Sequence, residues 1–277
     1  MKTKKNMGSK ILIYLAVIIS IFPIFWAVST SFKEPADSLK PTVIPFVTYK
    51  PTIISWQREF TLAGEELRRD MTNSLVIAVF STAIALLIGG LAGYSLSRFR
   101  FYRVKNSDIN MWILSQIFIP PVVVVIPIFI MMQFLHILDT PLSLILAHTT
   151  FNIPIATLLM RDVFMGVPVD IEESAMVDGC SRLHALWKVV LPLCAPAVVS
   201  AAILCFSFSW NEFVFALTLS YDNATTIPLL VAGSRHTQGI QFGVLGVRSV
   251  LAILPPAIFA MFIQRYIVRG LTFGAIK

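Results

Sequence analysis

The stretch from Asp170 to Pro192 reads DIEESAMVDGCSRLHALWKVVLP, and it is the longest run in the second half of the chain that lacks the composition of a membrane span. Pro168 just before it is expected to end the preceding helix. Asp170 and Glu173 have the spacing of a capping box, which predicts a helix start. Gly179 is expected to end that helix, as a C-terminal glycine does. The sequence therefore predicts a short helix and then a tight turn.

A second short helix is expected after Gly179. Its apolar residues fall at i, i+3, i+4, i+7 and i+8, and we expect them to form one stripe: Leu183, Leu186, Trp187, Val190 and Leu191. Apolar segments long enough to cross a bilayer flank the two helices. We therefore interpret residues 168–192, called the elbow below, as a structured connection between membrane spans that a second protein can hold.

The composition indicates an integral membrane protein. Of the 277 residues, 56% are hydrophobic and only 13% are charged, and the mean hydropathy is +0.79, which is far above what a soluble surface tolerates. The formal charge of +7 could suggest nucleic acid. However, the Lys and Arg residues flank apolar runs and form no stripe with aromatic residues, so we exclude nucleic acid as a partner and expect membrane lipid instead.

Cysteine and histidine spacing indicates neither disulfides nor a metal site. The three cysteines form no C-x-x-C pair, and the four histidines are scattered without ligand spacing: Cys180, Cys194, Cys205, His136, His148, His184 and His236. The chain also lacks G-x-x-x-x-G-K-[ST], so we expect no bound ATP phosphates. No paired carboxylates or nucleophile–base set supports a membrane enzyme. We expect no metal, no cofactor and no catalytic residue in this chain.

Six apolar runs predict six transmembrane helices in a single all-α domain that covers residues 1–277. The runs lie at about residues 11–32, 72–96, 111–135, 142–160, 195–219 and 250–267, each close to the roughly 20 residues that a spanning helix needs. The first run is too long for a signal peptide. Pro120, Pro121, Pro127 and Pro154 predict kinked helices packed in a bundle.

The distribution of basic residues places both termini in the cytoplasm. The segments on the inner side would then hold fourteen of the 22 basic residues: Lys2, Lys4, Lys5, Lys10, Arg98, Arg100, Arg103, Lys105, Arg161, Arg182, Lys188, Arg265, Arg269 and Lys277. The segment 33–70 would be an external cap of turns and short helices. The elbow would then lie in the cytoplasm.

Within the elbow, Glu173-Ser174-Ala175, Asp178-Gly179 and Leu191-Pro192 resemble the EAA loop of ABC importer permeases. Ser174 stands where that family usually has its first Ala, and Cys180 where Ala often follows the Gly. The resemblance implies that the loop docks into a groove on an ATP-hydrolysing subunit. The residues implied in coupling are Glu172, Glu173, Ser174, Ala175, Asp178, Gly179, Trp187, Leu191 and Pro192. The alternative is an interfacial hairpin without a partner.

Trp210-Asn211-Glu212-Phe213 in the fifth run resembles the W-N-x-[FY] signature of ABC sugar permeases. An acid inside a span costs about 2.5–3.5 kcal/mol on the translocon scale and normally faces a bundle interior or a wet cavity. An indole, an amide and a carboxylate suit a carbohydrate. Asn152, Gln116, Asn73 and His148 are weaker candidates for the same substrate path. The alternative for all of them is a role in tying helices together.

The last residues, 269–277, resemble the ending of the second permease of maltose transporters and its relatives. In that subunit the tail reaches between two ATPase subunits, which implies contacts by Gly270, Leu271, Thr272, Gly274 and Lys277. The alternative is a frayed terminus. Elsewhere, Asp139 is expected to cap the fourth span, and Arg235 and Arg248 to be interface anchors unless the substrate is anionic.

Together these resemblances imply a type I ABC importer permease for a carbohydrate-like solute, in the bacterial inner membrane. The implied partners are a second homologous permease, two ATPase subunits that carry ATP and Mg, and a periplasmic or lipid-anchored solute-binding protein. The implied mechanism is alternating access. The competing hypothesis is an ion-coupled secondary transporter with Glu212 as its proton or sodium site. It leaves the elbow and the tail unexplained.

Overall fold

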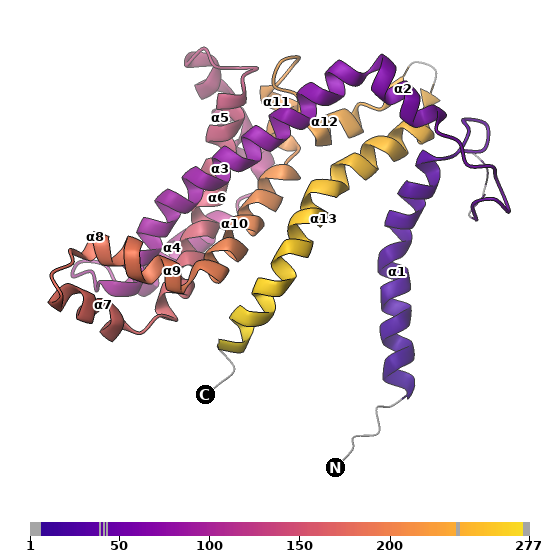
Figure 1. Ribbon diagram of the computed structural model, residues 1–277. Helices are drawn as coiled ribbons and strands as arrows, with labels where there is room; N and C mark the ends of the chain where they lie inside the picture. The colour runs from indigo at the N-terminus through magenta and orange to yellow at the C-terminus, as the bar shows by residue number, and fades with distance from the viewer. Residues whose placement is uncertain (1–6, 39, 41, 43, 237–238, 274–277) are drawn as a thin grey trace. The chain divides into compact units, whose positions relative to one another are not determined.

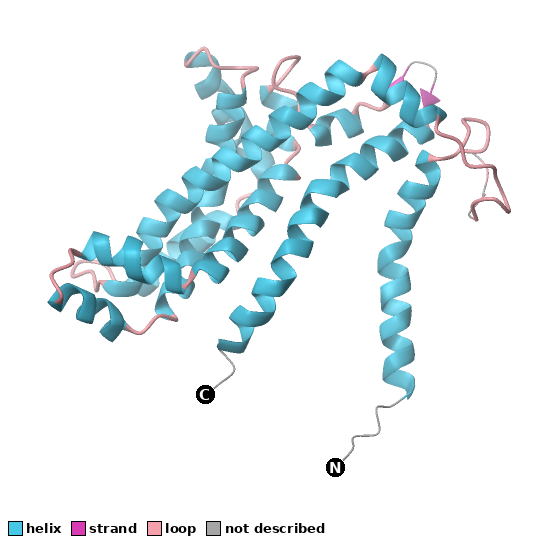
Figure 2. Ribbon diagram, in the orientation of Figure 1, coloured by secondary structure: helices cyan, strands magenta, loops and turns pink. Residues whose placement is uncertain are grey.

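The computed structural model describes residues 7–38, 40, 42, 44–236 and 239–273. Within these residues the chain is helical apart from one hairpin, in which β1 (Arg235–His236) pairs antiparallel with β2 (Gly239–Ile240) (Figure 2). The chain divides into two compact units. The first unit comprises residues 1–68 and 230–255, and the second comprises residues 69–229 and 256–277.

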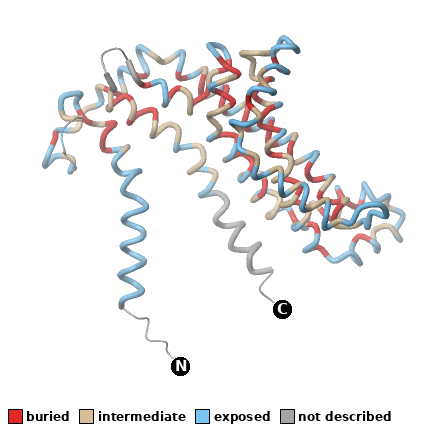
Figure 3. The backbone as a smooth tube through the Cα atoms, turned by 180° about the vertical axis from the view of Figure 1, so that it is seen from behind, coloured by how far each residue is buried: buried red, intermediate tan, exposed pale blue. Residues whose placement is uncertain are grey.

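The first unit contains α1 (Met7–Ser31), α2 (Ile54–Leu62), the hairpin, the first turn of α3 (Gly64–Arg98), the end of α12 (Ile227–Ala232) and the first half of α13 (Phe242–Phe273). The residues of α1 are exposed over most of its length, as the pale blue part of the tube in Figure 3 shows. Gly246 of α13 touches the end of α1, where a Cβ would lie 2.7 Å from the backbone nitrogen of Ser31. Glycine therefore permits this close crossing.

Two buried cations hold the polar part of the first unit together. Lys33 is fully buried, donates to the carbonyl of Thr42 and lies 4.6 Å from the ring centre of Trp26. Burial lowers the pKa of Lys33, and Asp37 partly opposes this shift. Arg248 pairs with Glu59 at 2.7 Å, and both side chains are buried. The expected external segment 33–70 is therefore tied to α1 and α13 by specific polar contacts.

The second unit contains most of α3, the end of α13 and the helices between them. These are α4 (Asn106–Ile117), α5 (Pro121–Phe134), α6 (Pro141–Met165), α7 (Val169–Val177), α8 (Arg182–Ala185), a π-helical turn (Leu186–Val190), α9 (Leu191–Leu193), α10 (Ala195–Trp210) and α11 (Val214–Leu219). Ile77, Leu144, Phe215 and Leu219 lie in one apolar cluster that joins α3, α6 and α11.

Four helices are long and apolar enough to cross a membrane: residues 8–31 of α1, α3, α6 and residues 242–261 of α13. Two bent pairs would bring the number to six. The expected third span, 111–135, consists of α4 and α5, which meet at 87° around Pro120 and Pro121. Proline lacks an N–H and disfavours helix in the residue before it, so two in succession favour a break.

The expected fifth span, 195–219, is also interrupted. Helix α10 ends at Trp210, and α11 begins only at Val214. A second bend of 86° separates α10 from the helical segment Arg182–Leu193. Hydropathy alone predicted one continuous segment because the broken part, residues 211–213, is too short to lower the average over a span-length window.

Candidate functional site

The first half of the elbow is α7, and its start differs from the expectation. The predicted capping box at Asp170 and Glu173 is wrong, because Pro168 occupies the N-cap position and no side chain caps the helix. Asp170 therefore falls inside the first turn, where its charge still favours the positive end of the helix dipole. Ser174 donates to the carbonyl of Asp170 at 2.8 Å, so its hydroxyl is used within α7.

The end of α7 follows the expectation. Gly179 has a φ of +92°, a left-handed conformation that glycine adopts without steric cost. The N–H of Cys180 donates to the carbonyl of Ala175, and the N–H of Gly179 to that of Met176, both at 3.0 Å. These two bonds form a Schellman motif. The turn between the two helices of the elbow is therefore fixed by backbone geometry.

The second half of the elbow presents two faces. Ser181 caps α8 by accepting from the N–H of His184. Leu186 and Val190 are buried, whereas Leu183 and Trp187 are 61% and 53% exposed. The predicted apolar stripe therefore has two kinds of surroundings, because Leu186 and Val190 pack in the core of the chain, whereas Leu183 and Trp187 are exposed. Leu191 is half-buried and Pro192 is exposed.

Glu172 attaches the elbow to the end of α3. Figure 1 shows α7 and α8 near this end of α3. Its side chain is 1% exposed. The carboxylate accepts from the hydroxyl of Tyr94 and, at 2.8 Å, from Nε of Arg98. Arg98 also donates to the carbonyl of Val167 at 3.0 Å. Both charges of this buried pair are thus neutralised and hydrogen-bonded, which such a pair requires to be favourable.

Further contacts surround this ion pair. Tyr94 meets Phe164 edge to face at 5.6 Å, and the guanidinium of Arg182 lies 5.0 Å from the ring centre of Phe99. Burial raises the pKa of the Glu172 carboxyl, the charge of Arg182 opposes the shift, and Glu173 adds to it. The expected coupling residue Glu172 therefore faces its own chain.

The remaining expected coupling residues share an outer surface. Glu173, Ser174, Asp178 and Gly179 are exposed, and Ala175 is half-buried. Three large apolar side chains of the elbow are exposed as well: Val177, which is 88% exposed, Leu183 and Trp187. We call Glu173, Val177, Asp178, Leu183 and Trp187 the outer face of the elbow. An exposed group of apolar side chains rimmed by charge is typical of a protein-binding surface.

Glu212 lies at the break between α10 and α11. Its carboxylate accepts from the N–H groups of Val214 and Phe215 at 2.8 and 2.9 Å, so it holds the start of α11. Nε2 of His148 on α6 lies 3.4 Å from this carboxylate, and Nδ1 of His148 contacts Ser209 at 2.7 Å. Glu212 is partly accessible, with 15% of its side chain exposed.

The other expected substrate-path residues are not gathered in one place. Trp210 is buried against Phe206, whereas Asn211 is exposed and donates to the carbonyl of Ser207. Asn152 is buried and donates to the carbonyl of Cys205, which ties α6 to α10. Asn73 ties α3 to residues 223–225, and Gln116 bonds only within α4 among the described residues: to Trp112 and Ser115.

Asp139 has a structural role that differs from the expected cap of the fourth span. Thr140 caps α6, whereas the carboxylate of Asp139 accepts from the backbone N–H groups of residues 221–224 at 2.9–3.1 Å. Burial alone would raise the pKa of Asp139, but these four backbone donors outweigh it and hold the pKa well below its usual range. No sequence signal identified this pairing across more than 80 residues.

Two further expectations concern the end of the chain. Arg248 was expected to be a membrane-interface anchor unless the substrate is anionic, but it is buried and paired with Glu59. Gly270, Leu271 and Thr272 of the expected tail belong to α13, whereas Gly274 and Lys277 lie outside the described residues. Among the described residues, no group of three or more His, Cys, Asp or Glu side chains could hold a metal ion.

Comparisons with known proteins agree on one family. The family described as "Binding-protein-dependent transport system inner membrane component" matches residues 85–273. The sulfoquinovosyl glycerol transport system permease protein SmoH of Agrobacterium fabrum is 34% identical over 95% of this chain and 91% of its own length. The trehalose/maltose transport system permease protein MalG of Thermococcus litoralis is 33% identical over 95% of this chain and 94% of its own.

A solved structure supports the fold. A chain of a bacterial ABC transporter that imports the acidic polysaccharide alginate aligns with a TM-score of 0.71, over 96% of this chain and 98% of that chain. The sequence identity is 23%, so this likeness concerns the architecture.

Proposed function

This chain belongs to the family of binding-protein-dependent transport system inner membrane components, and we propose that it forms the path of an ATP-driven importer for a carbohydrate-like solute with a second, homologous permease. The named cargo of its relatives supports the solute class, because trehalose/maltose and sulfoquinovosyl glycerol are sugars or sugar derivatives. The chain is a multi-pass inner-membrane permease and itself no enzyme. We propose that both termini lie in the cytoplasm.

The observation that carries the proposal is the outer face of the elbow. Its residues stand on two short helices that a Schellman turn joins and that a buried ion pair fixes to α3. A rigid surface loses little entropy when it binds a partner. We propose that an ATPase subunit grips the outer face and that two such subunits carry ATP and Mg. The tail residues Gly270, Leu271, Thr272, Gly274 and Lys277 are proposed to contact the same subunits.

The geometry suggests how the elbow would move the bundle. Glu172 joins α7 to Tyr94 and Arg98 at the end of α3, and α3 packs closely on α6 through Gly89 and Gly93. A displacement of the elbow would therefore be carried into two spanning helices as a rigid body. Alternating access needs such a rigid connection between the ATPase and the helices around the solute.

Glu212, Asn211 and Trp210 are proposed to form or support the solute path. Asn152, Gln116 and Asn73 are weaker candidates, because Asn152 and Asn73 tie separate segments together and Gln116 bonds within α4. A partly exposed carboxylate beside His148 can accept bonds from sugar hydroxyls. The competing hypothesis is an ion-coupled mechanism with Glu212 as its proton or sodium site, and it leaves the exposed outer face of the elbow without a role.

Two substitutions in the elbow test the proposal: one reverses a charge on the outer face, and the other adds a charge beside it at Gly179 and also strains the turn. Glu173→Lys and Gly179→Asp should abolish ATP-dependent uptake while insertion into the membrane stays intact. Glu66→Lys is the control, because Glu66 is an exposed acid outside the elbow. Uptake should follow ATP and be insensitive to a collapsed ion gradient. Normal transport by either elbow variant would show that the outer face does not dock.

A further inference from the structure

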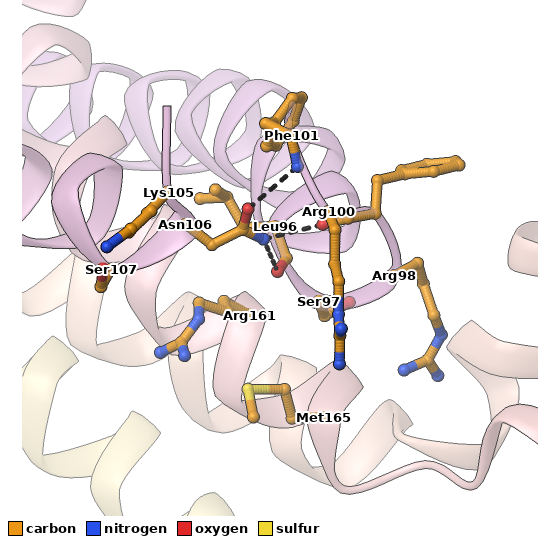
Figure 4. A pocket seen from close by; sticks show the side chains of 11 residues that line it. Leu96, Ser97, Arg98, Arg100, Phe101, Lys105, Asn106, Ser107, Arg161 and Met165 are labelled. Atoms are coloured by element: carbon orange, nitrogen blue, oxygen red, sulfur yellow. Dashed lines mark hydrogen bonds between the residues drawn. The ribbon is translucent and has the colours of Figure 1, made fainter. Parts of the chain in front are cut away.

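A basic pocket of about 500 Å³ lies between the end of α3, the connection to α4 and the end of α6 (Figure 4). Its lining includes four cationic side chains and no acidic one: Arg98, Arg100, Lys105 and Arg161. Figure 4 shows Arg100, Arg161 and Met165 around this pocket. None of the functions assigned above uses it, apart from the pairing of Arg98 with Glu172.

The loop that carries these cations is held in one shape by Asn106. The side-chain amide of Asn106 donates to the carbonyls of Leu96 and Phe99 at 3.0 and 2.7 Å, and its oxygen accepts from the N–H of Phe101 at 3.2 Å. These bonds close the connection between α3 and α4 into a compact turn (Figure 4). The cations are therefore placed before any ligand arrives, which reduces the entropy lost on binding.

The positive charge of the pocket is only partly compensated. Arg98 is paired with Glu172, and Arg161 contacts the exposed Asp162 at 3.1 Å. Arg100 and Lys105 form no ion pair with any residue that the structure describes. Nε of Arg161 is buried, and no acceptor for it exists in the described part of the chain. An anion is the ligand that would satisfy these groups.

The surroundings of the pocket indicate which anion. Phe99, Phe101, Tyr102 and Met165 are all exposed, at 42%, 44%, 102% and 57%. Cations beside exposed aromatic and apolar side chains, next to the end of a spanning helix, are typical of the membrane–water interface. A soluble anion would gain nothing from these apolar neighbours, whereas the acyl chains of a lipid would cover them.

We propose that this pocket binds the phosphate of an anionic membrane lipid, with Arg100, Lys105 and Arg161 as its charged contacts. The lipid phosphate would lie in the pocket between the end of α3, the connection to α4 and the end of α6. The proposal goes beyond the transport function, since it requires neither a particular solute nor ATP. A free phosphate compound offers the same chemistry without acyl chains, and the experiment separates the two sources.

The test measures lipid retention by the intact transport complex. The complex is exchanged into mixtures of phosphatidylglycerol and phosphatidylcholine, and native mass spectrometry counts the lipids that remain. The wild-type complex should prefer phosphatidylglycerol, and the triple variant R100Q/K105Q/R161Q should lose the preference by about tenfold or more, since it lacks all three charged contacts proposed for the lipid phosphate. R103Q is the matched control, because Arg103 is exposed on the same loop and does not line the pocket.

Charge-preserving variants guard against misfolding. R161K and R100K should keep the preference for phosphatidylglycerol. Equal retention of both lipids by the wild-type complex, or an unchanged preference in the triple variant, would overturn the proposal. Inorganic phosphate that binds the lipid-free complex through these three residues, without selective retention of lipid, would assign the pocket to a soluble anion. Loss of the ATPase subunits from the triple variant would assign it to protein docking.

Binding of inorganic phosphate without selective lipid retention and loss of the ATPase subunits from the triple variant would each also overturn the lipid proposal. Uptake in pure phosphatidylcholine tests the transport function separately. Selective lipid retention without ATP-dependent uptake would refute the transport function alone.

Discussion

Gly93 of α3 lies so close to Arg161 of α6 that a Cβ on Gly93 would stand 2.7 Å from the backbone nitrogen of Arg161. Gly89, one turn earlier, approaches Ala156 and Thr157 with similar distances of 2.8 and 2.9 Å. Glycines four residues apart share one helix face, and in membranes such small residues allow backbones to pack closely. The contact fixes α3 against α6 close to the point where Tyr94 of α3 bonds to Glu172 of the elbow.

Gly93→Ala should destabilise the permease, because the added methyl group meets backbone atoms that cannot turn away. Overpacking of this kind costs about 1–3 kcal/mol, and the melting temperature of the detergent-solubilised protein should fall. Gly90→Ala is the matched control, since its Cβ would meet only the end of the Met160 side chain at 3.9 Å. A Gly93→Ala protein as stable as Gly90→Ala would show that the two helices do not cross this closely.

Glu172→Gln should destabilise the protein, whereas Glu173→Gln should leave its stability unchanged. The first change leaves the buried Arg98 without its counter-ion, and removing one partner of a buried pair costs about 3–5 kcal/mol. The second changes an exposed side chain. Melting temperatures measure stability, and co-purification with the ATPase measures docking. Similar melting of the two variants would contradict the assignment of Glu172 to the interior.

Asp139→Asn should destabilise the protein at neutral pH by about 1–3 kcal/mol, because hydrogen bonds to a charged acceptor exceed those to a neutral amide. The pKa of Asp139 is lower in the fold than its unfolded value of about 3.9. Its ionised form therefore stabilises the fold fully above pH 4, and that contribution declines as the pH falls further. The stability difference between wild type and variant should be constant from pH 7 to 5 and shrink below about pH 4. A constant difference over the whole range would contradict this mechanism.

Glu59 and Arg248 should show strong coupling in a double-mutant cycle. Glu59→Gln or Arg248→Met alone leaves one buried charge uncompensated, at a cost of about 3–5 kcal/mol, whereas the pair changed together should cost less than either alone. Thermal unfolding of the four proteins measures the coupling. Additive effects would show that the two side chains do not form the ion pair.

The helical fold could be predicted from the sequence because apolar runs of span length leave few alternatives to helix in a bilayer. The turn at Gly179 was predictable because glycine is suited to the left-handed conformation there. The bend at Pro120 and Pro121 was predicted as a kink but not as the end of a helix, and the break at residues 211–213 was not predicted. Hydropathy records how apolar a segment is, and it contains no information on where the axis bends.

The roles of single charges at the candidate site depended on helix phase. Glu172 and Glu173 are adjacent and chemically alike, so only the rotation of α7 against α3 decides which one is buried. Arg98 could be counted as an inner positive charge, but its partner lies 74 residues away. The same reasoning applies to Arg248 and Glu59, which are separated by 189 residues. Local patterns do not record such long-range pairs.

Helix α1 presents every side chain from residue 8 to residue 26 outward, and Gly8–Ser31 is the most apolar of the spanning segments. Before Trp26, which contacts Lys33, neighbours in the described part of the chain thus place little demand on the shape of these side chains, and the membrane requires only that they be apolar. A cysteine introduced at Leu12, Ile18 or Phe22 would leave the fold undisturbed. A dye attached there would report whether lipid or another subunit surrounds the helix.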